Sequence, residues 1–244
     1  MFSDKDKLQI KTRGSEEETV IKQIDNFRRG FPYLRIEEAA SVGNGIIQLD
    51  AERLKKNELR YEEKIKSGIK PLKFVPASGA ASRMFKSLFE ALDECNKSDA
   101  PGDVLAKNKA ARQFISEIKK FAFYSDLQKA LAKNNVEPTG VNQIDFLLNE
   151  KGLNYGSLPK GLLKFHRYEN GDRTPFEEHL MEGALYAKDN QGVAHLHFTV
   201  SPEHQAVFEQ LLKEVKATYE KELDVTIEVS FSWQKPSTDA IAVD

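Results

Sequence analysis

Hydrophobic residues recur along much of the chain with the spacing of amphipathic helices. In residues 1–70 a capping-box pair, Ser15 and Glu18, precedes an apolar stripe that ends before Gly30. A second helix is expected to begin near Asp50. Charged residues fill most other positions here, which is typical of a solvated helical face. The pattern therefore predicts a polar, helical N-terminal segment.

The pattern changes after residue 70. Residues 72–75 form a short strand-like run, and residues 76–82 are almost all small. A helix is expected next, because its apolar residues fall at positions i, i+3, i+4 and i+7. Residues 96–152 keep helical spacing and show no strand pattern, which predicts a helical insertion. The stripe of the first of these helices consists of Phe85, Leu88, Phe89 and Leu92.

From Pro159 onward, predicted strands alternate with predicted helices. Strands are expected at 162–168, 193–200 and 225–232, a turn at 170–172, and helix starts at Thr174 and Ser201. Such alternation favours right-handed crossovers and a parallel sheet. We therefore predict an α/β fold of the Rossmann type, with a mainly parallel sheet flanked by helices. Its parts are a helical segment at 1–70, a core at 71–95 plus 153–244, and the insertion at 96–152.

Composition narrows the classes of protein. The chain has 244 residues, with 36 Lys and Arg against 38 Asp and Glu, giving a net charge of −2. The chain has no excess of basic residues, so its charge does not favour a nucleic-acid partner. The single cysteine, Cys95, has no partner for an internal disulfide, which fits a reducing compartment. No apolar run approaches the roughly 20 residues of a membrane span. We expect a cytoplasmic protein with no membrane partner.

The small-residue segment at 76–82 carries the candidate chemistry. A strand that leads through small side chains into a helix lets backbone N–H groups approach an anion, and the helix dipole favours negative charge there. Two familiar phosphate loops do not fit. The segment has one glycine, Gly79, against three in a dinucleotide fingerprint, and it lacks the Gly-Lys-Ser/Thr ending of a P-loop. It ends instead in Ser82-Arg83-Met84.

This segment resembles a known signature. Pro76-Ala77-Ser78-Gly79-Ala80-Ala81-Ser82-Arg83-Met84 is similar to the motif of nucleotide-sugar pyrophosphorylases, usually Leu-Ala-Gly-Gly-x-Gly-Thr-Arg-Met/Leu. Pro159-Lys160-Gly161-Leu162 resembles their Pro-Lys-Gly element, and Phe231-Ser232-Trp233-Gln234 resembles a Phe-x-Gln segment. The whole chain also resembles the N-terminal part of an uncharacterised Bacteroidetes domain family. In that family Val-Pro-Ala-Ser-Gly-Ala-Ala-Ser-Arg-Met recurs nearly unchanged.

The resemblance implies a GT-A-like nucleotidyltransferase domain. Its reaction joins a nucleoside triphosphate to a sugar 1-phosphate with release of pyrophosphate, assisted by Mg²⁺. The catalytic residues would be Arg83 and Lys160. Because members of both families continue past the equivalent of Asp244, we expect a core that is incomplete at its C-terminus. The residues that would bind the nucleotide are Ala77, Ser78, Gly79, Ala80, Ala81, Ser82 and Gln234.

Other interpretations stay open at this point. Arg83 also fits an ordinary exposed helix cation, and Ala81, in place of a motif glycine, favours a module that binds a nucleotide or nucleotide-sugar without turnover. His195 and His197 lie on one face of a predicted strand, within reach of one zinc or iron ion. Asp239 and Asp244 would offer carboxylates to Mg²⁺, or simply end the chain. The sequence fixes neither the metal ligands nor the oligomeric state.

Overall fold

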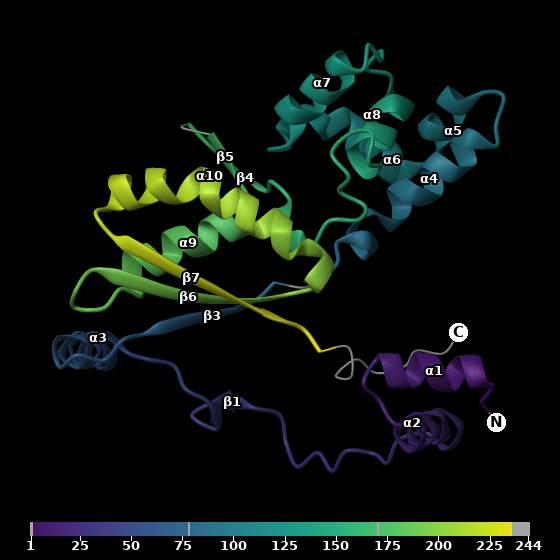
Figure 1. Ribbon diagram of the computed structural model, residues 1–244. Coiled ribbons are helices and arrows are strands. Elements are labelled where there is room, and N and C mark those ends of the chain that lie inside the picture. The colour runs from purple at the N-terminus through teal and green to yellow at the C-terminus, as the bar shows by residue number, and fades with distance from the viewer. Residues whose placement is uncertain (1, 78, 170, 236–244) are drawn as a thin grey trace. The chain divides into compact units, whose positions relative to one another are not determined.

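The computed structural model describes residues 2–77, 79–169 and 171–235 (Figure 1). The chain divides into two compact units. The first comprises Met1–Lys64 with Gln234–Asp244, and the second comprises Ile65–Trp233.

The first unit is helical and polar. A capping box between Ser3 and Asp6 starts the first helix, and Lys7 lies 3.5 Å from Glu17 of the second. Val20 is the one buried residue among those described in this unit. Its elements are α1 (Asp4–Thr12), α2 (Glu17–Arg29), β1 (Ser41–Val42), β2 (Gly45–Ile46) and most of α3 (Ala51–Lys66).

The predicted capping box at the start of α2 is wrong. The N-cap of α2 is Glu16, and no side chain caps it. Ser15 instead takes part in ending α1, because its backbone N–H donates to the carbonyl of Ile10 at 3.1 Å. The predicted stop at Gly30 is confirmed, since this C-cap residue has a φ of 78°.

The second unit contains a sheet and two sets of helices. Its strands are β3 (Leu72–Pro76), β4 (His166–Tyr168), β5 (Gly171–Arg173), β6 (Val193–Val200) and β7 (Thr226–Trp233). Its α-helices are α4 (Lys86–Asn96), α5 (Pro101–Lys107), α6 (Lys109–Glu117), α7 (Tyr124–Lys133), α8 (Gly140–Leu148), α9 (Pro175–Tyr186) and α10 (Gln205–Leu223). Short 3-10 helices are η1 (Ser82–Phe85), η2 (Ile118–Lys120), η3 (Lys160–Leu162) and η4 (Pro202–His204).

The sheet is parallel and has the order β3-β6-β7. Every second residue of the central strand, β6, is buried, because α9 and α10 pack on one face of the sheet (Figure 1). The predicted parallel sheet, its strands at 72–75, 193–200 and 225–232, and its flanking helices are thus confirmed. The buried residues of β6 are Ala194, Leu196, Phe198 and Val200.

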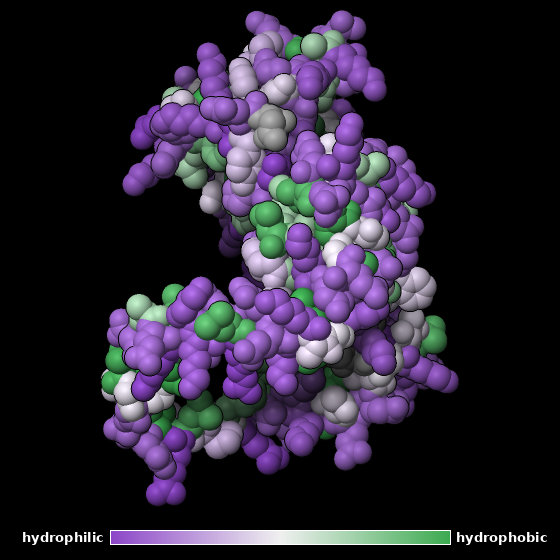
Figure 2. All heavy atoms as spheres, turned by 90° about the vertical axis from the view of Figure 1, so that its left-hand side faces the viewer, coloured by the Kyte–Doolittle hydropathy of each residue, from purple (hydrophilic) through white to green (hydrophobic). Residues whose placement is uncertain are grey.

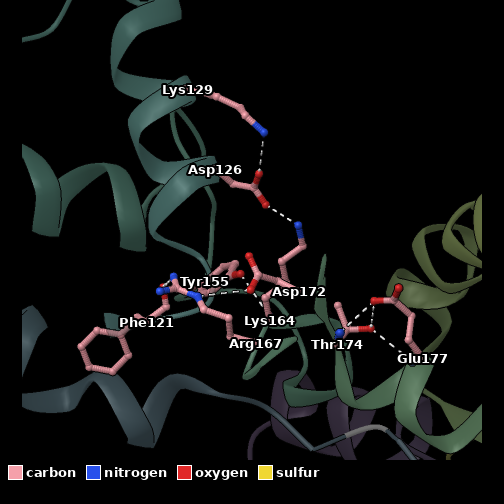
Figure 3. Close-up of polar contacts among 9 residues, drawn as sticks. All are labelled: Phe121, Asp126, Lys129, Tyr155, Lys164, Arg167, Asp172, Thr174 and Glu177. Atoms are coloured by element: carbon pink, nitrogen blue, oxygen red, sulfur yellow. Dashed lines mark hydrogen bonds and ion pairs between the residues drawn. The ribbon is translucent and has the colours of Figure 1, made fainter. Parts of the chain in front are cut away.

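The start of α9 follows the predicted capping box. The Thr174 hydroxyl accepts from the backbone N–H of Glu177, and the Glu177 carboxylate accepts from the backbone N–H of Thr174 at 2.8 Å (Figure 3). Glu177 is buried and also accepts a hydrogen bond from the Tyr219 hydroxyl at 2.9 Å. One carboxylate therefore caps α9 and links it to α10.

The helices α4 to α8 surround a hydrophobic core of their own. Leu127, Ile144 and Leu147 are fully buried in it. The described residues between 96 and 152 contain no strand, as the periodicity predicts.

The predicted strand at 162–168 is largely wrong. Leu162 ends η3 and packs into the sheet core, whereas the next residue, Leu163, packs into the helical core. An apolar run that fills two different cores imitates the pattern of a buried strand. Only β4 forms, paired antiparallel with β5 outside the main sheet. The predicted turn at 170–172 is displaced: the chain reverses between Tyr168 and Gly171, which pair with each other, and β5 already begins at Gly171.

Hydrophilic side chains predominate on the face seen in Figure 2, with hydrophobic ones in small groups. Across the part of the chain that the structure describes, no helix combines the length and the apolar character that a membrane crossing requires.

Candidate functional site

A pocket of about 180 Å³ lies at the carboxyl ends of β3 and β6. In open parallel sheets this end is where ligands bind, because loops converge there above the strands. The first turn of α9 contributes to the wall, and Phe208 of α10 closes the apolar side. The lining residues are Val75, Pro76, Ala77, Gly79, Lys160, Gly161, Pro175, Phe176, His179, Phe198 and Phe208.

The structure brings the two motif segments together at this pocket. The backbone N–H of Lys160 donates to the carbonyl of Gly79 at 3.0 Å, and Ala80 pairs with Pro159 in a β-bridge. At the other end of the loop, the N–H of Ala77 donates to the carbonyl of Thr199 in β6 at 2.8 Å. Backbone hydrogen bonds therefore hold the small-residue loop against the Pro-Lys-Gly segment.

The two glycines of the pocket have different roles. A Cβ at Gly161 would lie 3.1 Å from the ring of Phe208, so this glycine permits close packing. A Cβ at Gly79 would meet no atom of the described residues within 4 Å, its chain neighbours left aside, and its backbone needs no left-handed conformation. Gly79 is therefore not required by the fold, and it leaves open space beside its backbone.

Two cations flank the loop. Lys160 lines the pocket, whereas Arg83 lies in η1 and does not line it. Both side chains are exposed, and neither forms an ion pair with any residue that the structure describes. Both charges thus remain available to an anion.

A histidine that the sequence patterns did not single out also lines the pocket. The Nδ1 atom of His179 lies 3.2 Å from Glu182 Oε2, and Lys73 pairs with the same carboxylate. The hydrogen bond from Lys73 holds the pKa of Glu182 below its ordinary value. An ionised carboxylate only accepts, so Nδ1–H of His179 donates, and in the neutral imidazole this leaves Nε2 as an acceptor.

The remaining loop residues divide into exposed and buried positions. Ala80 and Ser82 are exposed, whereas Ala81 is fully buried in the helical core. The Ala81 methyl group therefore contributes to packing. Ser78 lies outside the described residues. Gln234 follows the last residue of β7 and belongs to the first unit.

His195 and His197 do not converge on a shared ligand. The ring nitrogens of His195 face Asp189 at 3.2 Å and Glu228 at 3.0 Å. Those of His197 each lie 2.8 Å from a serine hydroxyl of β7. Within the described ranges, no group of three or more His, Cys, Asp or Glu side chains is arranged to hold a metal ion. Asp239 and Asp244 lie outside these ranges.

The pocket does not match a protein-held Mg²⁺ site either. Magnesium in proteins is usually bound by one or two carboxylates together with phosphate oxygens. None of the described residues that line the pocket is Asp or Glu. Most of the residues that line the pocket are apolar, and Lys160 is the cationic side chain among the described ones.

These features define a class: an α/β protein with a three-stranded parallel sheet, helices on one face and a small pocket at the carboxyl ends of the strands. The chain belongs to the family described as a domain of unknown function (DUF4301), which matches residues 3–244. No curated protein and no solved structure matches the chain.

Proposed function

We propose that the pocket binds the phosphates of a nucleoside triphosphate, and that the chain is a nucleotidyltransferase-like domain whose second substrate is a sugar 1-phosphate. One observation carries the proposal. Two segments far apart in the chain, each similar to a nucleotide-sugar pyrophosphorylase motif, meet through the hydrogen bond from Lys160 N–H to Gly79 O at 3.0 Å. They meet at the strand ends, where such ligands bind.

Individual cationic side chains at and beside the pocket support anion binding. The chain has a net charge of −2, so no general field attracts phosphates. Local groups must therefore supply the affinity. Lys160 offers a compact ammonium at the pocket, and Arg83 offers a guanidinium fork that suits two phosphate oxygens.

The size of the pocket restricts what enters it. Pockets that enclose a whole small ligand measure about 300–1,000 Å³. At about 180 Å³, this pocket takes phosphoryl groups, with the base and sugar lying outside it. Mg²⁺ would arrive with the triphosphate as part of the substrate.

The proposed reaction is an in-line displacement. A phosphate oxygen of the sugar 1-phosphate attacks the α-phosphorus, a new P–O bond forms, and the bond from the α-phosphorus to the bridging oxygen of the β-phosphate breaks. Pyrophosphate leaves with that electron pair. Lys160 stabilises charge on the α-phosphate and Arg83 stabilises it on the departing phosphates. No protein nucleophile is needed.

A thermal-shift panel tests binding. UTP, other nucleoside triphosphates and UDP-sugars are added with and without Mg²⁺ to the wild type and to Lys160→Ala and Arg83→Ala. A ligand at 100 times its Kd stabilises by about 2.7 kcal/mol. We expect each variant to lose most of this shift, while Lys213→Ala, an exposed lysine on α10, keeps it. A wild type that no nucleotide stabilises would contradict the proposal.

A second candidate is a module that binds a nucleotide or nucleotide-sugar without turnover. The absence of Asp and Glu among the described lining residues favours it, because no carboxylate there would position Mg²⁺ for catalysis. Pyrophosphate release from UTP and glucose 1-phosphate separates the two. Release that Lys160→Ala abolishes supports the enzyme, and nucleotide binding without release supports the module.

A further inference from the structure

A second pocket, of about 340 Å³, lies among the helices of the second unit. Met84 and Phe85 of η1 contribute to it, so η1 borders this pocket while the loop before η1 lines the first. The two pockets share no lining residue. An apolar cavity of about 150 Å³ accepts benzene. The second pocket therefore has room for a larger apolar group.

Aromatic rings form its walls. Phe121 and Phe123 stack with ring centroids 5.1 Å apart, and Phe114 lies 5.4 Å from Phe121. Phe123 meets Tyr155 edge-on at 5.4 Å. At the mouth, Phe121 and Met84 are exposed. An added ring has both faces and edges to pack against, which aromatic pairs favour.

The buried hydroxyl group of Tyr155 lines this pocket and has a proton that no described residue accepts. Tyr155 is only 6% exposed, and its hydroxyl oxygen accepts from the backbone N–H of Lys164 at 3.1 Å. No described residue accepts the hydroxyl proton. Burial raises the pKa of Tyr155 to about 12, so the proton stays bound at neutral pH. A buried donor without an acceptor is costly, and a bound oxygen would satisfy it.

The charges around the pocket are already compensated. Lys164 lies 2.5 Å from Asp126, whose other oxygen faces Lys129 at 3.4 Å (Figure 3). Arg167 pairs with Asp172 at 3.4 Å and also donates to the carbonyl of Phe121. An ionised ligand would meet no unpaired charge here, and burying it would be unfavourable. The chemistry therefore selects a neutral ligand.

We propose that this pocket binds a neutral aromatic group that carries a carbonyl oxygen beside its ring. The ring packs against Phe114, Phe121 and Phe123, and the carbonyl oxygen accepts the proton of the Tyr155 hydroxyl. This site is separate from the phosphate site of the proposed function, and neither depends on the other.

The test compares two probes of nearly equal shape: 1-indanone, which has the carbonyl, and indane, which lacks it. Their Kd values are measured by ligand titration in NMR spectra of the full chain. We expect 1-indanone to bind about 2- to 10-fold more tightly, the contribution of one hydrogen bond. Tyr155→Phe keeps the ring and should abolish this preference. Equal binding of the two probes, or a preference that survives in Tyr155→Phe, would overturn the proposal.

A substitution that fills the pocket tests whether 1-indanone binds there. Ala110 lines the pocket at an exposed position of α6, so Ala110→Trp fills it from the rim without disturbing the core. It should weaken 1-indanone binding about tenfold or more. Ala132→Trp, at an exposed position of α7 outside the pocket, is the matched control and should bind like the wild type. Failure of the wild type to bind 1-indanone, or unchanged binding by Ala110→Trp, refutes the assignment.

Discussion

Single side chains determine what each pocket accepts. In the first pocket Lys160 and His179 provide polar groups, and Gly79 leaves its backbone accessible. In the second, the buried Tyr155 hydroxyl accepts from the backbone N–H of Lys164, and its own proton has no acceptor among the described residues. The two pockets thus differ in chemistry: a cationic and an imidazole side chain among apolar residues in one, and aromatic surface with a neutral donor in the other.

The raised pKa of Tyr155 gives a pH prediction. Its unfolded-state pKa is near 10, and burial raises the folded-state pKa to about 12. Between these values the unfolded state binds fewer protons, so this residue lowers the stability of the fold by about 1.4 kcal/mol per pH unit. Below pH 10 the full stability is present. The difference in unfolding free energy between wild type and Tyr155→Phe should therefore shift by about 2–3 kcal/mol from pH 9 to pH 12.

Urea unfolding at several pH values measures this difference. Other tyrosines and lysines titrate in the same range, but their effects cancel between the two proteins. A difference that stays constant across the range would show that Tyr155 ionises as it does in the unfolded chain.

Elements with strong local signals could be predicted from the sequence. The strict alternation in β6 fixed both the strand and its buried face, and the Thr-Pro-x-Glu pattern fixed the start of α9. An element whose apolar residues pack into two different cores could not be predicted. Leu162 packs into the sheet core, whereas Leu163 packs into the helical core. Ser15 was misjudged because capping depends on how the preceding helix ends.

The candidate site, too, could be predicted from the sequence only in part. The loop and Lys160 could be proposed from motifs, because their chemistry is local. The presence of His179 in the pocket could not be predicted from the sequence, because it depends on how α9 packs on the sheet. The aromatic pocket could not either, because Phe114, Phe123 and Tyr155 meet only through tertiary packing.

The capping box of α9 contributes to stability through Thr174 and Glu177. Thr174→Ala removes a hydroxyl that bonds the buried Glu177 carboxylate at 2.9 Å, and should destabilise the chain by about 1–2 kcal/mol. Thr139→Ala is the matched control, because Thr139 caps α8 at an exposed site without a reciprocal carboxylate. It should cost less, about 0.5–1 kcal/mol. Urea unfolding compares the two, and an equal or smaller loss for Thr174→Ala would argue against the role of Glu177.

At the scale of the whole molecule, burial is concentrated in the second unit. Both hydrophobic clusters lie there, whereas Val20 alone is buried among the described residues of the first unit. The second unit therefore contains most of the buried apolar side chains, and their burial supplies most of the stability. The first unit has little core of its own.

Limited proteolysis tests this distribution. Residues 31–40 are exposed and have no helix or strand, and Arg35 is the one trypsin site among them. Trypsin should cleave first after Arg35, because exposed irregular segments are cut most readily. Mass spectrometry of the earliest fragments identifies the cut. First cleavage inside the helices between 86 and 148 would contradict the assignment of stability to the second unit.

Calorimetric titration of UTP onto the wild type and Gly79→Ala tests whether the loop backbone and Lys160 bind phosphates. Apart from its chain neighbours, a Cβ at Gly79 meets no described protein atom within 4 Å, so the variant should keep its stability within about 0.5 kcal/mol. The methyl group would nevertheless occupy the space beside the backbone that a phosphate needs. We predict that the wild type binds UTP and that Gly79→Ala binds it roughly tenfold more weakly. A wild type that does not bind UTP, or equal binding by both proteins, would contradict the claim.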